Sequence, residues 1–172
     1  TMLPPVHHLR NYTLEPYQTH HLNKYLEMAL DKEVLSFMGG VSGSVIEETK
    51  LFNKIFALYQ VQEDRWFWVW AVTHNNRLVA HVELKETALT TKDELEIVYM
   101  VHPAERRKGV MVEVLEFLKS SQKEWNKKIT ATVDETNIAS MSLLKKWGIE
   151  KQELMKDENN GEEFLKIWLA NV

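Results

Sequence analysis

The sequence predicts a mixed α/β (α+β) fold, in which helices flank a central sheet. Apolar segments rich in β-branched and aromatic residues alternate along the chain with segments whose apolar residues recur at helical spacing. Residues 94–133 have the order strand, helix, strand, which is typical of a βαβ unit with parallel strands. The strands on either side of this unit lie next to short turns, which favour antiparallel pairs. We therefore expect a mixed sheet.

The N-terminal part of the chain predicts one strand followed by two helices. Residues 6–14 are a candidate strand. From Tyr17 onward, apolar residues recur every three or four positions, which predicts an amphipathic helix that ends before Gly39. Ser44 and Glu47 have the S-x-x-E form of a capping box, and the apolar stripe after them predicts a second helix.

The middle and the C-terminal part predict the remaining elements. Asn75 and Asn76 separate two strand-like segments and indicate a hairpin turn. Gly148 is expected to end the last helix, because a glycine tolerates positive φ. The predicted strands and helices, in chain order, are strands 65–72, 77–85 and 94–101, helix 109–122, strand 127–133, helix 138–147, and strands 149–155 and 163–170 around a turn at 157–161.

Length and composition indicate one domain that spans residues 1–172. With 44% hydrophobic and 27% charged residues, the chain can bury one sizeable core. Its formal net charge of −4 disfavours direct binding of nucleic acid. It has no cysteine, which excludes disulfides, thiolate metal sites and a cysteine nucleophile. No apolar run approaches the roughly 20 residues of a membrane span, and no signal peptide is recognisable, so we expect a cytoplasmic protein without a membrane partner.

The segment VHPAERRKGVMVEVLEFL, residues 101–118, is a strand-loop-helix junction that can hold an anion. The first turn of a helix presents unpaired N–H groups and a partial positive charge, both of which favour a phosphate. Gly109 lets the backbone approach a ligand closely, and Arg106, Arg107 and Lys108 add cations. A solvated basic turn is the alternative. Neither a Walker A motif nor G-x-G-x-x-G occurs, so these residues alone leave the phosphate ligand open.

A second motif, DETNIASMSLLKKWGIE, occupies residues 134–150. The two motifs and their order along the chain resemble those of the GNAT family of acyl-CoA-dependent N-acetyltransferases. Within this family they most closely resemble the RimJ/RimL type. Enzymes of that type acetylate protein N-termini, including those of ribosomal proteins. Residues 96–101 are similar to the family's central strand and residues 102–109 to its R-x-x-G-x-G/A pyrophosphate loop. Residues 137–149 are similar to its N-x-x-S…Y-x-K-x-G-F segment. The resemblance covers about residues 9–170 and implies a GNAT fold with a bulged fourth strand.

The resemblance implies acetyl-CoA as co-substrate and assigns roles to particular residues. Glu96 is implied as the general base, and Ser140 as the group near the cofactor sulfur. A structural carboxylate is the alternative for Glu96, because Glu83, Glu86 and Glu94 also lie near the expected cleft. The residues implied to bind acetyl-CoA are Met100, Val101, Arg106, Arg107, Lys108, Gly109, Val110, Met111, Asn137 and Lys146. Met100 and Val101 would act through their backbone N–H groups, and a helix N-cap is the alternative for Asn137.

Two residues depart from the family pattern. Met111 stands where the loop usually has a second Gly or Ala, so its side chain must point away or crowd the pyrophosphate. Leu144 stands where many members place a Tyr that protonates the leaving thiolate. That role is unfilled at this position, as it commonly is in RimJ/RimL-type sequences.

The predicted function is acetyl transfer from acetyl-CoA to a primary amine, by direct attack in a ternary complex, with a protein N-terminus as the favoured acceptor. A small amine, such as an aminoglycoside, polyamine or amino acid, is the alternative acceptor, and a noncatalytic acyl-CoA-binding module is the second alternative. We expect no metal, because the adjacent pairs His7-His8 and His20-His21 lack a third ligand. Trp66, Trp68 and Trp70 occupy alternate positions of one strand and so share one face. We expect them to pack in the core or on the sheet surface rather than to stack on nucleic-acid bases. A homodimer is left open.

Overall fold

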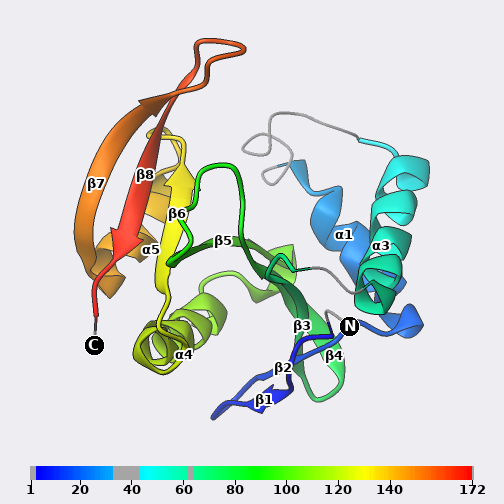
Figure 1. Cartoon of the computed structure of the whole chain (residues 1–172). Helices are drawn as coiled ribbons and strands as arrows, with labels where there is room; N and C mark the ends of the chain where they lie inside the picture. The colour runs from blue at the N-terminus through cyan, green and yellow to red at the C-terminus, as the bar shows by residue number, and fades with distance from the viewer. Residues whose placement is uncertain (1–2, 33–42, 62–63, 172) are drawn as a thin grey trace.

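A mixed sheet of eight strands forms the middle of the molecule (Figure 1). The computed structural model describes residues 3–32, 43–61 and 64–171. The strands are β1 (His7–His8), β2 (Thr13–Glu15), β3 (Phe67–His74), β4 (Arg77–Lys85), β5 (Glu94–Val101), β6 (Lys128–Val133), β7 (Ile149–Lys156) and β8 (Glu163–Leu169). Their order in the sheet is β1-β2-β3-β4-β5-β6-β8-β7. β5 and β6 pair in parallel and the other neighbours in this sheet are antiparallel, which confirms the predicted mixed α/β class.

Helices cover both faces of this sheet. The described helices are α1 (Leu22–Ala29), α3 (Val45–Gln60), α4 (Val110–Trp125) and α5 (Ile138–Trp147), with short 3-10 turns η1 (Thr19–His21) and η2 (Pro103–Glu105). α1 and α3 lie together on one side, away from α4 (Figure 1). Their buried side chains, such as Tyr25 and Phe52, form one apolar cluster with β3. α4 and α5 bury Leu115 and Leu144 in a larger cluster against the other face. This burial of apolar surface holds the layers together.

The predicted hairpin turn and the predicted start of the second helix are confirmed, whereas the predicted first strand is divided in two. Residues 6–14 form two short strands, β1 and β2, because the chain turns between Leu9 and Tyr12. Asn75 and Asn76 adopt φ of 50° and 64°, as a tight hairpin turn requires. The Ser44 hydroxyl accepts a hydrogen bond from the Glu47 N–H at the start of α3.

The first predicted helix is shorter at its start than the periodicity suggests. It begins at Leu22, after η1, rather than near Tyr17. Tyr17 instead lies in the extended segment that precedes η1 and is buried against α1 and α3. The predicted end of the helix, before Gly39, lies outside the described residues. At the other end of the chain, Gly148 follows α5 with φ of 95°, as predicted.

The sheet opens between β5 and β6. β5 pairs with β6 only through Glu94, Leu95 and Glu96. Beyond Glu96, β5 continues along β4 while β6 continues along β8. β5 is the strand predicted to be the bulged fourth one, yet it keeps one register along β4 throughout, and the register shifts among the described strands fall in β3 and β7. The irregularity at β5 is therefore its separation from β6.

Candidate active site

The two faces of β5 contribute different side chains to the opening. Successive residues of a strand point to opposite faces. Val98 and Met100 border a pocket beneath α3 on one face. Tyr99 and Val101 pack against the α4 and α5 cluster on the other. After the roles that the family resemblance leads us to expect, we call the side that faces α1 and α3 the acceptor side and the side that faces α4 and α5 the cofactor side.

The backbone of β5 also has two edges. The His102 N–H donates to the Val79 carbonyl oxygen at 2.9 Å, which fixes the alternation of the antiparallel ladder with β4. In this register Met100 lies opposite His81, so its N–H is directed at β4. The N–H groups of Tyr99 and Val101 are directed toward the edge from which β6 has separated. The prediction took the amides of Met100 and Val101, whereas the register favours Tyr99 and Val101.

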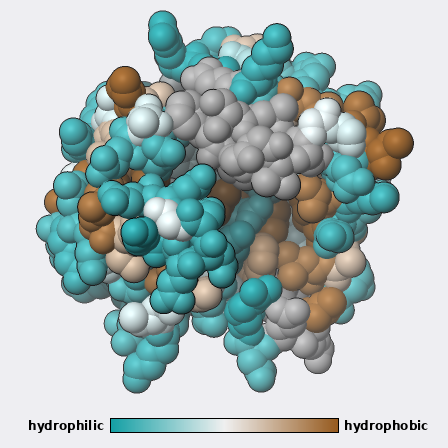
Figure 2. Space-filling model, turned by 90° about the horizontal axis from the view of Figure 1, so that it is seen from above, coloured by the Kyte–Doolittle hydropathy of each residue, from teal (hydrophilic) through white to brown (hydrophobic). Residues whose placement is uncertain are grey.

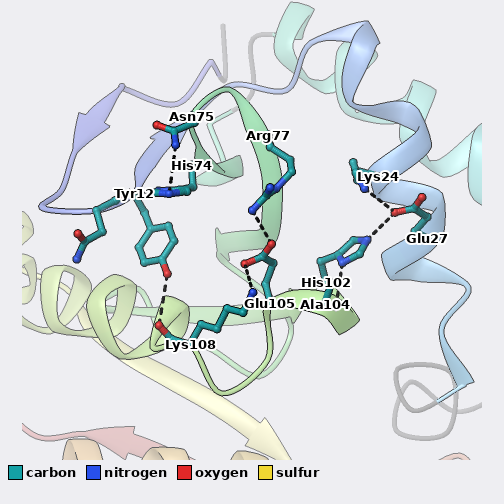
Figure 3. Close-up of polar contacts among 11 residues, drawn as sticks. Tyr12, Lys24, Glu27, His74, Asn75, Arg77, His102, Ala104, Glu105 and Lys108 are labelled. Atoms are coloured by element: carbon teal, nitrogen blue, oxygen red, sulfur yellow. Dashed lines mark hydrogen bonds and ion pairs between the residues drawn. The ribbon is translucent and has the colours of Figure 1, made fainter.

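The loop after β5 is built around a buried carboxylate (Figure 3). Glu105 is 8% exposed and accepts a hydrogen bond from the Arg77 guanidinium at 2.7 Å. The Lys108 ammonium lies 3.7 Å from its other oxygen. The Tyr12 hydroxyl donates to the Lys108 carbonyl oxygen at 3.5 Å. These contacts tie the loop to β4 and to the β1–β2 turn, and they partly neutralise Lys108.

Helix α1 holds the loop from the acceptor side. The His102 ring accepts at Nδ1 from the Ala104 N–H and donates from Nε2 to Glu27 at 2.6 Å (Figure 3). The His102 hydrogen bond, with a contribution from a neighbouring lysine, lowers the pKa of Glu27. Arg106 binds Asp31 at 2.7 Å, so it braces the loop against the end of α1. Arg107 is exposed, has φ of 62°, and makes no ion pair with a described residue.

The first turn of α4 presents backbone donors rather than side chains. Gly109 precedes the helix with φ of 82° and offers no side-chain cap. The first intrahelical bond runs from the Glu113 N–H to the Gly109 carbonyl at 3.2 Å, so the N–H groups before Glu113 are not used within the helix. A Cβ added at Gly109 would meet no atom within 4 Å, which indicates open space for a ligand. These donors fit the pyrophosphate of acetyl-CoA.

Val110 and Met111 contribute only through this backbone. Their side chains are 2% and 5% exposed and belong to the core beneath α4. The side chain of Met111 therefore points away from the loop and does not crowd the space for the pyrophosphate. Leu144, the other departing residue, is completely buried in the same core.

Ser140 lies beside the opening, in the first turn of α5. Its hydroxyl oxygen accepts a hydrogen bond from the Tyr99 hydroxyl at 3.1 Å. Because the Ser140 oxygen accepts from Tyr99, its own proton remains available for another acceptor. Asn137 caps α5 by accepting from the Ser140 N–H at 3.1 Å, as the structural alternative predicts. Its amide nitrogen makes no hydrogen bond within the described part of the chain. Lys146 is exposed in the last turn of α5, well beyond Ser140.

A pocket of about 400 Å³ opens on the acceptor side of β5. Most of its wall is apolar and comes from α1, α3, β3 and β5. The lining residues are Tyr25, Ala29, Glu48, Leu51, Lys54, Ile55, Leu58, Phe67, Val69, His81, Glu83, Val98 and Met100. Seen from above, the molecular surface is hollowed near its centre (Figure 2). The volume lies within the range of pockets that bind small molecules or side chains.

A chain of hydrogen bonds lies along the floor of this pocket. The Tyr17 hydroxyl contacts His81 Nδ1 at 2.6 Å, His81 Nε2 contacts Glu83 at 2.8 Å, and the Lys85 ammonium donates to Glu83 at 2.7 Å. Burial raises the pKa of Tyr17 well above its ordinary value, so its hydroxyl keeps its proton. Burial would raise the pKa of Glu83, but the contacts with His81 and Lys85 outweigh it and lower that pKa to about 2.

Glu96 lies on the same face of the sheet and has the opposite electrostatic character. It is 8% exposed, and its Oε1 makes no hydrogen bond with the described residues. Burial raises its pKa, with a further contribution from Glu83, although the charges of Lys85 and Lys166 oppose the shift. Glu83 is therefore ionised at neutral pH and well below it, while Glu96 gives up its proton at a higher pH than an ordinary glutamate does. Such opposed shifts in neighbouring carboxylates are typical of acid–base sites.

The other candidate carboxylate, Glu94, has structural partners. It accepts from Lys166 at 2.9 Å and from the Trp168 ring N–H at 2.6 Å. Lys166 also donates to the Leu89 carbonyl oxygen, so this cluster fastens the β4–β5 loop to β8. Glu94 is thus committed to the sheet, unlike Glu96.

Sequence reasoning missed Tyr17, His81 and Tyr99. His81, Glu83 and Lys85 alternate in HVELK, so a strict period of two could have placed them on one strand face. No pattern in the sequence pairs Tyr17 with His81, because these residues are far apart along the chain and meet only when the N-terminal segment folds over β4. Among the described residues, no His, Asp and Glu side chains gather into a metal-binding group, and none of the helices is long and apolar enough to cross a membrane.

Comparisons with known proteins agree with this fold. Three solved structures superpose over nearly the whole chain. A GNAT acetyltransferase from Bacillus anthracis is 17% identical, with a TM-score of 0.74 over 95% of this chain and 96% of that chain. Mycobacterium smegmatis RimJ in complex with CoA-disulfide is 16% identical, with a TM-score of 0.73 over 95% and 86%. The ribosomal-protein-S5-alanine acetyltransferase of Vibrio fischeri is 12% identical, with a TM-score of 0.73 over 98% and 97%.

These identities show a shared fold. No curated protein sequence matches the chain. A family model described as the acetyltransferase (GNAT) domain matches residues 11–150, a segment that contains the loop after β5, the start of α4 and the whole of α5. The chain therefore belongs to the GNAT family of acetyltransferases.

Proposed function

We propose that the chain transfers the acetyl group of acetyl-CoA to a primary amine, which attacks the thioester directly within a ternary complex. A protein N-terminus is the proposed acceptor. The observation that supports this most strongly is the opening between β5 and β6. The unused N–H groups at the start of α4, which can donate to a phosphate, lie on one side of β5. Glu83 and Glu96 lie on the other side.

On the cofactor side, backbone groups would hold acetyl-CoA, which supplies an acetyl thioester. The N–H groups of the first turn of α4 would bind the pyrophosphate, with Arg107 as the neighbouring cation. The amide nitrogen of Asn137 would contact the pantetheine arm. The N–H groups of Tyr99 and Val101 would stabilise negative charge on the carbonyl oxygen as the amine attacks.

On the acceptor side, Glu96 would remove a proton from the amine, directly or through a water. Its raised pKa brings it closer to the pH at which a base works best. The amine nitrogen then forms a bond to the carbonyl carbon, and the carbon–sulfur bond breaks. Ser140, whose oxygen accepts from Tyr99, would donate a hydrogen bond to the departing thiolate sulfur and stabilise its charge until the sulfur takes up a proton from solvent.

A small amine is the second candidate acceptor, and the pocket of about 400 Å³ favours it. Met111 and Leu144 would favour the noncatalytic alternative, because both depart from the family's cofactor and catalytic pattern. The buried side chain of Met111 removes part of that support, because it leaves the loop uncrowded.

The test is an acetyl-CoA turnover assay that measures release of free CoA thiol. The acceptor panel contains peptides with free N-termini, the same peptides with blocked N-termini, and small amines. We expect thiol release with free amines and none above background with the blocked peptides. Binding of CoA by calorimetry without thiol release from any amine would support the noncatalytic module instead.

A further inference from the structure

The residues that line the acceptor pocket indicate which kind of amine the pocket binds. We infer that it binds a primary ammonium joined by a short tether to a bulky apolar group, and that Glu83 is the anchor for the ammonium. The first residue of a peptide and a free aralkylamine both present this chemistry. The inference rests on the proposed function, because it takes the pocket to hold the acceptor.

The wall of the pocket suits an apolar group. Leu51, Ile55 and Leu58 approach from α3, and Val69 and Val98 approach from the sheet. Ile55 and Val69 are buried, whereas Leu51 is 43% exposed at the rim. An apolar group that enters would leave water and cover these side chains, which is favourable without any specific polar contact.

The floor of the pocket suits a cation. Glu83 has a side chain that is only 20% exposed, and His81 and Lys85 each bind one of its oxygens. A carboxylate has about four lone-pair positions, so a further donor can be accommodated. His81 is itself fixed by Tyr17, which holds the carboxylate in one orientation. An ammonium in this partly desolvated position is attracted more strongly than it would be in water.

The position of Glu83 also connects binding to the chemistry. Glu83 lies opposite Val98 in the ladder, and Glu96 lies opposite Lys85. The two carboxylates are therefore diagonal neighbours on one face of the sheet, a relation that places side chains within reach of a common ligand. An ammonium anchored at Glu83 would lie beside the group proposed to remove its proton. A ligand with a carboxylate in place of the ammonium would be repelled.

The first experiment uses the unaltered protein and two matched acceptor pairs. One pair is a Phe-initial and an Ala-initial peptide with the same remaining sequence, and the other is phenethylamine and ethylamine. For each pair that is turned over, we expect the KM of the phenyl-bearing member to be at least about tenfold lower than the KM of the other member. Apolar pockets achieve discrimination of this size. The pair that turns over identifies the source as peptide or free amine. 3-Phenylpropionate, which carries an anion instead, should not inhibit.

The second experiment separates the anchor from the base. Glu83→Gln should raise KM for the phenyl-bearing acceptor by about tenfold or more, because a charge-assisted contact is lost, and should lower kcat less than Glu96→Gln does. Glu153→Gln, an exposed carboxylate on β7, is the matched control and should change neither constant. Val98→Phe would narrow the pocket and should reduce the preference for the phenyl group.

The outcomes are distinguishable. Thiol release that shows no preference for the apolar group, or a KM that Glu83→Gln leaves unchanged, would overturn this inference while the proposed function stands. No thiol release with any amine would overturn the proposed function, and this inference with it. Circular dichroism of each variant shows whether a loss of activity reflects unfolding.

Discussion

The cofactor side and the acceptor side of β5 are built in different ways. On the cofactor side, the proposed binding groups are mainly backbone N–H groups of a loop and a helix start that are continuous in sequence. On the acceptor side, Tyr17, His81, Glu83 and Glu96 come from three separate segments, and folding buries all of them except Glu83, whose side chain is 20% exposed. One side thus depends on local conformation and the other on tertiary packing.

This difference teaches where each side is vulnerable. Backbone donors survive most side-chain changes, as Met111 shows by packing into the core where the family pattern has a small residue. A buried charge network has no such tolerance, because removal of one member leaves its partners unsatisfied in a region of low dielectric. We therefore expect the largest effects on the acceptor side.

Glu96→Gln should have the largest effect. It keeps the shape of the side chain but removes the proposed base, so turnover should fall by roughly 10² to 10⁴. The ratio of wild-type to variant rate should fall as pH rises, because an amine above its own pKa needs no base. Rate measurements from pH 6 to pH 10 test this, with Glu153→Gln as the control. Full activity of Glu96→Gln at neutral pH would refute the assignment.

Glu83→Gln should affect stability through its pH dependence. The folded-state pKa is lowered from 4.5 to about 2, so ionised Glu83 stabilises the folded protein above the unfolded-state pKa. That contribution is about 3 kcal/mol, and it is lost as pH falls from 4.5 toward 2. The difference in free energy of unfolding between wild type and Glu83→Gln should therefore shrink over this interval. Urea unfolding at several pH values measures it, and a constant difference would contradict the network.

Arg107→Gln should have a moderate effect on the cofactor side. Arg107 is the exposed loop cation that pairs with no described carboxylate, so it remains available for a phosphate. CoA affinity should fall about tenfold, the usual value of one hydrogen bond to a charged group. Lys123→Gln, at the opposite end of α4, is the control. Calorimetry should show a weaker Kd only for Arg107→Gln, and equal values would remove Arg107 from the phosphate site.

Tyr99→Phe should have the smallest effect. It removes the hydroxyl that donates to Ser140 but leaves the ring packed against the core. Turnover should fall about fivefold, as expected for one neutral hydrogen bond that positions a group. The reduction should be smaller than that of Ser140→Ala and independent of pH. In the Ser140→Ala background, Tyr99→Phe should have no further effect, and an additive loss would show that Tyr99 acts separately.

The sequence by itself determined the local features of this protein. The order of strands and helices after residue 65, the Asn75–Asn76 turn, the glycine at the end of α5 and the helix start after Gly109 were all predictable. Each depends on periodicity or on the φ that a residue tolerates, which are properties of short segments. The family motifs belong to the same class, because they lie in loops and helix starts.

Only the tertiary structure decided how the charges are paired. Arg106 has a side chain suited to binding a phosphate, but folding brings Asp31 within 2.7 Å of its guanidinium, so the two form an ion pair. His81 looks like an ordinary strand residue, but burial beside Tyr17 and Glu83 makes it part of the pocket floor. Glu94 and Glu96 are two residues apart and alike in sequence, yet one binds Lys166 and Trp168, while one oxygen of the other makes no hydrogen bond within the described part of the chain. Long-range packing sets the dielectric and the partners of each charge, and neither can be read from neighbouring residues.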